Sequence, residues 1–466
     1  MKKTVLRFLA IAFLLVFTLS ACDVRSANAY HPNDSYTDAV VTRAGTFSGV
    51  FRIKTEASES LTLDPDSSVS SVRGDAIRER YEEVEKLFNC TIEARQVKTG
   101  NIASTMMAST AAARNYADIF QMSASGIYDM YKGGYLTYAQ NLDEFDVNDE
   151  KWGFEGHKSM MTFRDGETYG FRNQYWAAPL PSVSGVLYYN SGILDENVQP
   201  LPAELYEQDE WTWDAFADIC NSVTHHVSDR QGTFAFVTPT ADFPEIIHAA
   251  INSNGGRRLS YDSVTGYKCE YMNWNTINAL QWLGELVRNN KITYDPENSV
   301  SERADVEAFV NFYTAFLVSD SSVGFSEDEM FPLYTFEENF RWTEFPKGPM
   351  FEGKTTAYYS TTDQFLAISN TVDIGITGKI LNALFEPLGG EDENGWKEYI
   401  ERNFFFFSED YERYENMIKN AVSDDSLLTM KTNLSENDVF AAVIDGVKTP
   451  KEATEQLISV IEGLAG

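Results

Sequence analysis

The sequence predicts an α/β protein built from two or more lobes. Its 466 residues are too many for one ordinary hydrophobic core, which favours lobes of roughly 100–200 residues each. Apolar patterns typical of strands and of helices alternate along the chain, and this alternation indicates largely parallel sheets covered by helices. Hydrophobic residues make up 43% of the chain and aromatic residues 14%, so there is enough apolar surface to form these cores.

The charge balance argues against several classes of partner. The chain has 37 Lys and Arg residues against 70 Asp and Glu residues, a formal net charge of −33. Such a surface repels phosphate backbones and anionic lipid headgroups. We therefore expect no nucleic-acid partner and no basic patch that docks on a membrane.

Residues 1–21 are predicted to be a lipoprotein signal peptide. Three basic residues within the first seven precede an apolar run over residues 8–17, which is shorter than the ~20 residues that a membrane-spanning helix needs. The segment Leu19-Ser20-Ala21-Cys22 resembles the lipobox of bacterial lipoproteins, in which the cysteine is diacylated, for example with palmitate. An ordinary signal peptide with an incidental Cys22 is the alternative, and it would also export the protein.

Residues 22–47 are predicted to be a lipidated cysteine followed by a flexible tether. They are rich in polar residues and show little apolar periodicity. At 5–6 Å × √n, such a tether reaches roughly 25–30 Å. We expect a globule held at the cell membrane by its lipid and facing the extracellular side or the periplasm.

Three further cysteines, Cys90, Cys220 and Cys269, are isolated and far apart in the sequence. An odd number cannot all pair within one chain, so either at least one thiol is free or the protein works where nothing oxidises its cysteines. The chain has no C-x-x-C motif. We interpret these cysteines as small buried hydrophobic residues.

The first part of the body has a β-α-β pattern. Apolar residues at 77, 81, 84 and 88 follow a 4-3-4 spacing and predict a helix over residues 74–89. Strands are expected on either side of it, at residues 50–53 and 90–97. A further buried strand over residues 117–122 leads into a small-residue turn with Ser123, Ser125 and Gly126.

The later elements are indicated by turn and capping signals. Asp165-Gly166 predicts a two-residue hairpin between residues 162–164 and 167–169, and residues 186–190 form a strand. Thr212 is a plausible N-cap for a helix that follows it, and residues 276–289 form another helix. The last helix opens with Thr449-Pro450-Lys451-Glu452, which combines a capping box with proline at the first helical position.

Signatures of catalysis are missing. The five histidines do not form H-E-x-x-H or any other metal spacing, and the chain has neither G-x-S-x-G nor S-x-x-K. We expect no enzyme activity, no cofactor and no metal. A surface-anchored glycoside hydrolase is the alternative, because two distant carboxylates are enough for that chemistry.

Eight motifs then occur in an order that resembles the family 1 extracellular solute-binding proteins of ABC importers, the group of maltose-binding protein. The hairpin departs from the family pattern, because Phe171-Arg172 stand where a proline is usual. The motifs cover residues 117–466 and are Ala117-Asp118-Ile119-Phe120, Lys132-Gly133-Gly134-Tyr135-Leu136 through Leu142, Asp165-Gly166-Glu167-Thr168-Tyr169-Gly170-Phe171, Leu187-Tyr188-Tyr189-Asn190-Ser191-Gly192-Ile193-Leu194, Trp211-Thr212-Trp213-Asp214-Ala215-Phe216, Asn254-Gly255-Gly256, Phe345-Pro346-Lys347-Gly348-Pro349 and Thr449-Pro450-Lys451-Glu452-Ala453.

The resemblance implies a two-lobed, periplasmic-binding-protein-like (type II) fold with strands that cross between the lobes. Lobe 1 would cover residues 48–182, with about 358–385 returning to it. Lobe 2 would cover residues 183–357, with the C-terminal helices of about 386–466. The crossings are expected near residues 180–187 and 355–365, and a ligand would be enclosed as the lobes hinge.

A sugar site needs aromatic platforms and short hydrogen-bonding side chains on rigid loops. Such side chains occur next to the predicted crossings and at strand ends, and each of them has an alternative role as a core or capping residue. The candidate ligand-binding residues are Asn173, Tyr175 and Trp176 before the first crossing, Ser123 and Ser125 after a strand, Tyr359 and Asp363 on the second crossing, and Trp342 and Trp274 elsewhere.

The expected function is that of a lipid-anchored, monomeric solute-binding subunit. It would capture a solute, above all an oligosaccharide, between its lobes and deliver it to the transmembrane subunits of an ABC permease. A binding protein of the same fold for a peptide, polyamine or other charged solute is the alternative, and that alternative predicts a site dominated by carboxylates.

Overall fold

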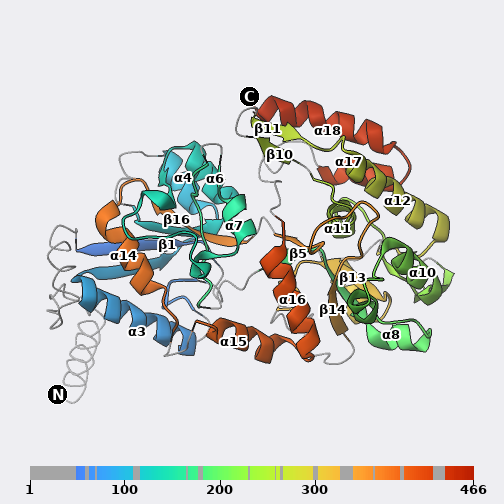
Figure 1. Ribbon diagram of the computed structural model, residues 1–466, viewed down its shortest axis with the longest axis horizontal. Helices are drawn as coiled ribbons and strands as arrows, with labels where there is room; N and C mark the ends of the chain where they lie inside the picture. The colour runs from blue at the N-terminus through green and yellow to red at the C-terminus, as the bar shows by residue number, and fades with distance from the viewer. Residues whose placement is uncertain are drawn as a thin grey trace, which may run out of the picture.

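The computed structural model shows two α/β lobes side by side (Figure 1). The structure describes residues 49–57, 62–68, 71–108, 116–163, 166–176, 182–228, 231–257, 259–262, 266–296, 303–325, 340–359, 363–388, 393–422 and 436–465. The predicted signal peptide, Cys22 and the tether lie outside the described residues, as does Asp165 of the predicted hairpin.

Lobe 1 is built on a five-stranded sheet in the order β2-β1-β3-β16-β4. The strands β1 (Val50–Thr55), β2 (Thr91–Gln96) and β3 (Ile119–Ser123) are parallel, and β16 (Gln364–Ser369) runs antiparallel to β3 and to β4 (Leu136–Thr137). The helices of this lobe are α3 (Ser71–Phe88), α4 (Asn101–Ala108), α6 (Ala124–Lys132), α7 (Glu155–Met160) and α14 (Ile374–Leu384), with short 3-10 turns η1 (Ala139–Asn141) and η2 (Glu150–Trp152).

The apolar stripe that predicted the first helix is buried in lobe 1. Ile77, Tyr81, Val84 and Phe88 of α3 are at most 2% exposed and pack in the same core as β1 and β2. The 4-3-4 spacing therefore correctly predicted both the helix and the face that it buries.

Lobe 2 has a three-stranded sheet, β13-β6-β14, that is antiparallel throughout. The prediction of largely parallel sheets is wrong for this sheet. The strand β6 (Val186–Asn190) runs away from lobe 1, whereas β13 (Phe316–Ser319) and β14 (Phe340–Glu344) both end opposite its first residue, Val186. A pattern of alternating helices and strands does not fix strand direction when a strand returns by a long connection.

The rest of lobe 2 consists of small two-stranded sheets and helices. The sheets are β7 (His225–Ser228) with β8 (Gln231–Thr233), β9 (Phe236–Val237) with β12 (Thr293–Tyr294), and β10 (Leu259–Asp262) with β11 (Gly266–Cys269). The helices are α8 (Ser191–Glu196), α9 (Pro202–Glu207), α10 (Trp213–Val223), α11 (Glu245–Ser253), α12 (Trp274–Asn290) and α13 (Ala304–Val310).

Two predicted helix starts are confirmed in atomic detail. The hydroxyl of Thr212 accepts a hydrogen bond from the Ala215 N–H at 3.4 Å, which caps α10. At α18 (Pro450–Ala465), Glu452 N–H donates to the Thr449 hydroxyl at 3.3 Å and Thr449 N–H donates to the Glu452 carboxylate at 2.9 Å. This reciprocal pair is a capping box.

A short antiparallel pair of strands joins the lobes. In it, β5 (Val183–Ser184) pairs with β15 (Tyr358–Tyr359). The chain continues from β5 into the sheet of lobe 2, and from β15 into the sheet of lobe 1. Both strands therefore cross between the lobes, and they lie within the ranges that the resemblance implied for the crossings.

The C-terminal helices divide between the junction and lobe 2. The helix α15 (Gly395–Phe404) runs from lobe 1 towards lobe 2 along the lower edge of the molecule, and α16 (Ser408–Asn420) packs against both β14 of lobe 2 and α7 of lobe 1 (Figure 1). The helices α17 (Glu436–Ile444) and α18 pack against α12 in lobe 2. The helix α16 thus contacts both lobes beside the crossing strands.

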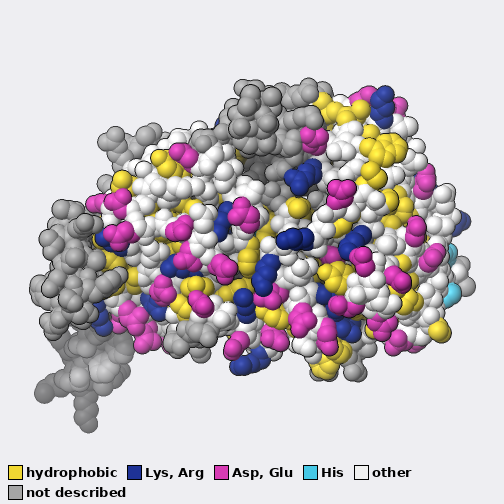
Figure 2. All heavy atoms as spheres, in the orientation of Figure 1, with side chains coloured by type: hydrophobic (Ala, Val, Ile, Leu, Met, Phe, Trp, Pro, Cys, Tyr) yellow, Lys and Arg dark blue, Asp and Glu magenta, His cyan; other side chains and the backbone are white. Residues whose placement is uncertain are grey.

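Acidic side chains are spread over both lobes on the face in Figure 2, and Lys and Arg side chains occur between them near the junction. The large net negative charge is therefore not confined to one lobe on this face. No helix in the described ranges is both long and apolar enough to cross a bilayer.

Candidate functional site

The crossing strands identify which edges of the two sheets face each other. The strand β16 begins directly after the second crossing, so its first residue, Gln364, marks the edge of the lobe 1 sheet next to lobe 2. Likewise β6 begins directly after the first crossing, so Val186 marks the corresponding edge of lobe 2. We call these two edges the facing edges.

Ser123 and Ser125 lie on the facing edge of lobe 1. Ser123 ends β3 and pairs with Gln364. Its hydroxyl caps α6 by accepting from the Gly126 N–H at 3.4 Å, and it lies 3.4 Å from the Ser125 hydroxyl. Both side chains are half-buried. Ligands in α/β folds bind beyond the carboxyl ends of parallel strands, and this edge is the carboxyl end of β3.

A charged cluster lies on the facing edge of lobe 2. Ser319 ends β13 and pairs with Val186. The Arg303 guanidinium donates to the Asp305 carboxylate at 3.1 and 3.0 Å and to the Ser319 hydroxyl at 3.2 Å. A guanidinium held in this two-pronged way has a fixed orientation.

Two further carboxyl groups belong to this edge. Asp320 follows β13 directly, and its carboxylate accepts from the Ser322 N–H at 2.8 Å. Glu245 is the first residue of α11, which packs against β13. Burial is the main cause that raises the pKa of Glu245 to about 7; the charges of Asp305 and Asp320 contribute to the rise, and Arg303 opposes it. The lobe 2 edge thus offers three carboxyl groups and one guanidinium.

Tyr128 lies at the boundary of the lobes. It belongs to α6 of lobe 1, yet it packs against the hydrophobic core of lobe 2 as well as that of its own lobe. Its ring lies edge-on to Phe163, with the ring centroids 5.5 Å apart. It is half-buried, so part of its ring remains exposed at the boundary of the lobes.

Asp363 and Tyr359, the candidates on the second crossing, are buried. The Asp363 carboxylate, 5% exposed, forms an ion pair with the fully buried Arg172 guanidinium and lies 3.2 Å from His157 Nε2. The Tyr359 hydroxyl donates to the carbonyl oxygen of Ile418 in α16. These contacts are internal, so the structure favours a role for both residues in fixing the crossing.

His157 is enclosed in the same cluster. Its ring contacts the Tyr359 ring at a tilt of 37°, with the ring centroids 3.7 Å apart. Burial lowers the pKa of His157 well below its usual value, and the charges of Arg172 and Lys158 lower it further. The imidazole is therefore neutral at neutral pH, and the ion pair beside it is between Arg172 and Asp363.

The three candidates before the first crossing have different surroundings. The Trp176 indole is 4% exposed, packs on Phe385 with the ring centroids 4.9 Å apart, and donates to the carbonyl oxygen of Glu386 at 2.8 Å. Asn173 is buried, and its side-chain oxygen accepts from the Tyr175 N–H at 3.2 Å. Tyr175 is half-buried. The placement of Trp176 favours a core role.

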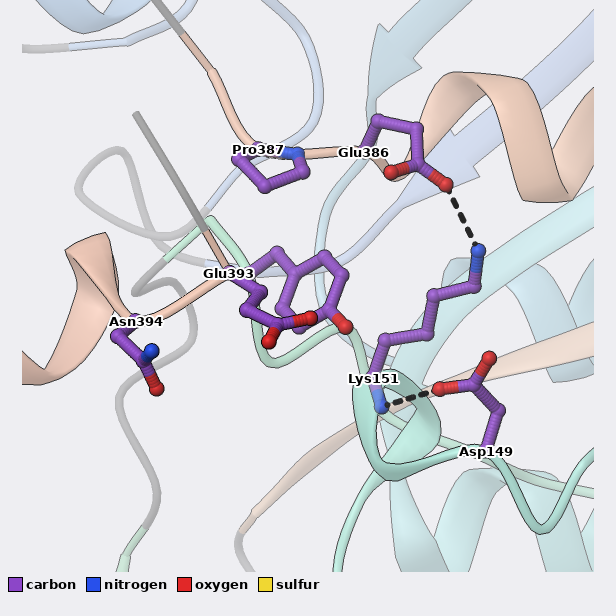
Figure 3. A pocket seen from close by; sticks show the side chains of 7 residues that line it. Asp149, Lys151, Glu386, Pro387, Glu393 and Asn394 are labelled. Carbon is purple, nitrogen blue, oxygen red and sulfur yellow. Dashed lines mark hydrogen bonds and ion pairs between the residues drawn. The ribbon is translucent and has the colours of Figure 1, made fainter. Parts of the chain in front are cut away.

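Tyr175 lines a pocket of about 510 Å³ in lobe 1 (Figure 3). Burial, together with the charges of neighbouring carboxylates, raises the pKa of Tyr175 to about 12. Lys151 projects towards Glu386 across one side of the pocket, with their charged atoms 3.0 Å apart. The pocket is not at the facing edges, and its lining residues are Asp149, Lys151, Tyr175, Glu386, Pro387, Glu393 and Asn394.

The two remaining tryptophan candidates lie elsewhere. Trp342 of β14 is 6% exposed and packs between Tyr188 and Phe405 in the core. Trp274, the first residue of α12, is 60% exposed on the surface of lobe 2. The structure brings neither side chain together with Ser123 and Ser125.

Six of the residues described at the facing edges did not enter the sequence prediction: Tyr128, Glu245, Arg303, Asp305, Ser319 and Asp320. Asp320 had a usable signal, because an apolar strand followed by Ser319-Asp320 repeats the pattern that selected Ser123. The sequence has no comparable signal for Glu245 and Arg303, since they lie at this edge only because α11 and α13 pack against β13. No group of three or more potential metal ligands occurs among the residues that the structure describes.

Several solved structures share this arrangement of lobes. The cyclic α-maltosyl-1,6-maltose binding protein of Arthrobacter globiformis matches with a TM-score of 0.63 and 12% identity, over 89% of this chain and 98% of that one. The sugar-binding protein MalE of Xanthomonas citri matches with a TM-score of 0.62 and 15% identity, over 89% and 97%. The chain has the fold of these solute-binding proteins.

The solute-binding fold also includes a structure with a different kind of ligand. UgpB of Mycobacterium tuberculosis, solved in complex with glycerophosphocholine, matches with a TM-score of 0.55 and 12% identity, over 89% of this chain and 99% of that one. No family model and no curated protein sequence matches the chain. The proteins of Arthrobacter globiformis and Xanthomonas citri are both named for the sugars that they bind.

Proposed function

We propose that this protein is the solute-binding subunit of an ABC importer and captures an oligosaccharide between its facing edges. The observation that supports the proposal is the pair of crossing strands, from which we infer that Ser123 and Ser125 lie opposite a polar edge of lobe 2. Sugars are recognised by short polar side chains, carboxylates and aromatic faces, and the facing edges supply all three. The protein would perform no covalent chemistry.

Isothermal titration calorimetry with a panel of neutral glycans, including maltotetraose and mannotriose, tests the proposal. We expect one or more glycans to bind with one site per chain. Turnover of a bound glycan into shorter products would instead support the hydrolase alternative. Heat signals absent for every glycan would contradict the sugar assignment.

A cationic or zwitterionic solute is the second candidate, and the charged cluster of lobe 2 favours it. Glu245, Asp305 and Asp320 place three carboxyl groups beside one guanidinium, so the edge is complementary to a positive ligand. Spermidine and glycerophosphocholine belong in the same titration panel for this reason. Binding of these compounds in place of glycans would assign the protein to this class.

The proposal includes a lipid anchor at Cys22. The Cys22→Ala variant lacks the thiol that would be acylated, so it should lose all incorporation of labelled palmitate and be exported either unprocessed or released from the membrane. Metabolic labelling followed by fractionation measures both effects, and Cys90→Ala is the matched control that should keep its label. Lipid on the Cys22→Ala protein would contradict the assignment. A tethered position on the outer side of the membrane and delivery to a permease are parts of the same proposal.

A further inference from the structure

Glu344 holds the start of the second crossing against lobe 2. It is the last residue of β14 and is 2% exposed. Its Oε2 accepts a hydrogen bond from the Thr356 N–H at 2.7 Å and another from the Thr355 hydroxyl. Its Oε1 is buried and has no hydrogen-bond partner. One carboxyl oxygen thus accepts two hydrogen bonds, whereas the other is buried and accepts none.

The same place also receives the first crossing. The Thr356 hydroxyl donates to the carbonyl oxygen of Phe345 at 2.6 Å, and the Phe345 N–H donates to the carbonyl oxygen of Gly185 at 3.0 Å. Gly185 lies between β5 and β6 with a φ of +79°, and a Cβ there would lie 3.2 Å from the Tyr358 ring. Glu344 therefore lies next to both crossing strands, which must bend when the lobes move, and a change in its protonation can affect both of them.

The surroundings of Glu344 favour its neutral form. Burial raises the pKa of Glu344 to about 7, although the hydrogen bonds from Thr355 and Thr356 and the charge of Lys347 lower it. Lys347 forms its ion pair with Asp209 at 2.6 Å, and Tyr206 of α9 is a further titratable group whose environment includes Glu344. A buried carboxylate without full compensation is costly, so ionisation favours conformations that admit water.

We propose that Glu344 is a proton-dependent latch on the crossing strands. In its neutral form it holds Thr355 and Thr356 against lobe 2, and its ionisation favours lobe arrangements in which these residues are released. The latch would regulate the lobe movement by which the proposed function captures a solute. Only its effect on ligand affinity rests on that proposed function.

At the lobe 1 end of the second crossing, the buried carboxyl group has a positively charged partner, unlike Glu344. Asp363 is buried too, but its carboxylate is opposite the Arg172 guanidinium. A positive partner stabilises the ionised form of a carboxyl group. The segment is therefore held by an ion pair at the lobe 1 end and by the proton-dependent latch at the lobe 2 end.

Small-angle X-ray scattering of the ligand-free protein at pH 5.5 and pH 8 tests the latch. We expect the radius of gyration of the native protein to change between the two values. If released arrangements restore a pKa near 4.5, the ratio of the two populations changes by up to about 25-fold over this range. The Glu344→Gln variant keeps an acceptor oxygen and cannot ionise, so it should retain the pH 5.5 value throughout.

Two further variants make the result specific. Asp118→Asn removes another carboxyl group whose pKa is raised by burial, at the end of β3 away from the facing edges, and should leave the pH dependence of the radius unchanged. Thr355→Val removes one donor to the ionised carboxylate, so its transition should move to higher pH, and it serves if Glu344→Gln does not fold. An equal change of radius in Glu344→Gln and the native protein would overturn the latch, as would a native radius that does not change.

The test separates the latch from the proposed function. The scattering experiment uses no ligand, so a protein that binds no glycan can still show the latch. Conversely, a glycan that binds with the same affinity at pH 5.5 and pH 8 would leave the proposed function intact and overturn the latch. Thermal unfolding at pH 5.5 checks that Glu344→Gln is folded, since glutamine resembles the neutral carboxyl group that prevails there.

Discussion

Replacing Asp363 with alanine is expected to lower the free energy of unfolding by about 3–5 kcal/mol. The change removes the carboxylate that lies against the fully buried Arg172 guanidinium, and it leaves that positive charge enclosed. It also removes the oxygen 3.2 Å from His157 Nε2. Urea unfolding followed by tryptophan fluorescence measures the loss.

A pair of matched variants separates the buried charge from the lost contacts. The double variant Arg172→Met with Asp363→Leu removes both charges and should recover much of the stability, because well-packed apolar residues can replace a buried ion pair. Asp363→Asn keeps the shape and removes only the charge. A loss below about 1 kcal/mol in Asp363→Ala would show that the ion pair does not hold the crossing, and would return Asp363 to the candidates for ligand contact.

Local signals in the sequence predicted many of the elements because their causes are local. Thr212 caps α10 and Thr449 pairs with Glu452 within four residues, so short-range chemistry determines where these helices begin. The apolar stripe of α3 likewise needs no distant partner to indicate its buried face. The two-lobed arrangement came from the order of motifs along the chain rather than from any one of them.

The features that were missed depend on residues far apart in the sequence. The antiparallel sheet of lobe 2 arises because β13 and β14 return to β6 from more than 120 residues away. Glu245 and Arg303 meet at the facing edge through the packing of α11 and α13 around β13. Residue type alone cannot show such encounters between residues far apart in the sequence.

Trp176→Ala is expected to cost about 3–5 kcal/mol of folding stability while leaving ligand affinity in the folded fraction nearly unchanged. The indole is packed on Phe385 and hydrogen-bonded to the backbone of Glu386, residues that lie more than 200 positions further along the chain. Removing it leaves a cavity in the core of lobe 1 and an unpaired carbonyl oxygen. A tryptophan that stacked on a sugar would behave in the opposite way, with an affinity loss of roughly 5- to 150-fold and little loss of stability.

Tyr175→Ala is the matched control, because it removes a neighbouring aromatic side chain that is only half-buried and lines the lobe 1 pocket. Its cost in stability should be clearly smaller than that of Trp176→Ala, since less of its surface is removed from water. Thermal unfolding and calorimetric titration with the best-binding glycan, both measured on each variant, separate the two roles. A Trp176→Ala protein with a native melting temperature and strongly weakened binding would show that the indole leaves the core to meet the ligand, and lobe 1 would then have to rearrange around Phe385 when the ligand binds.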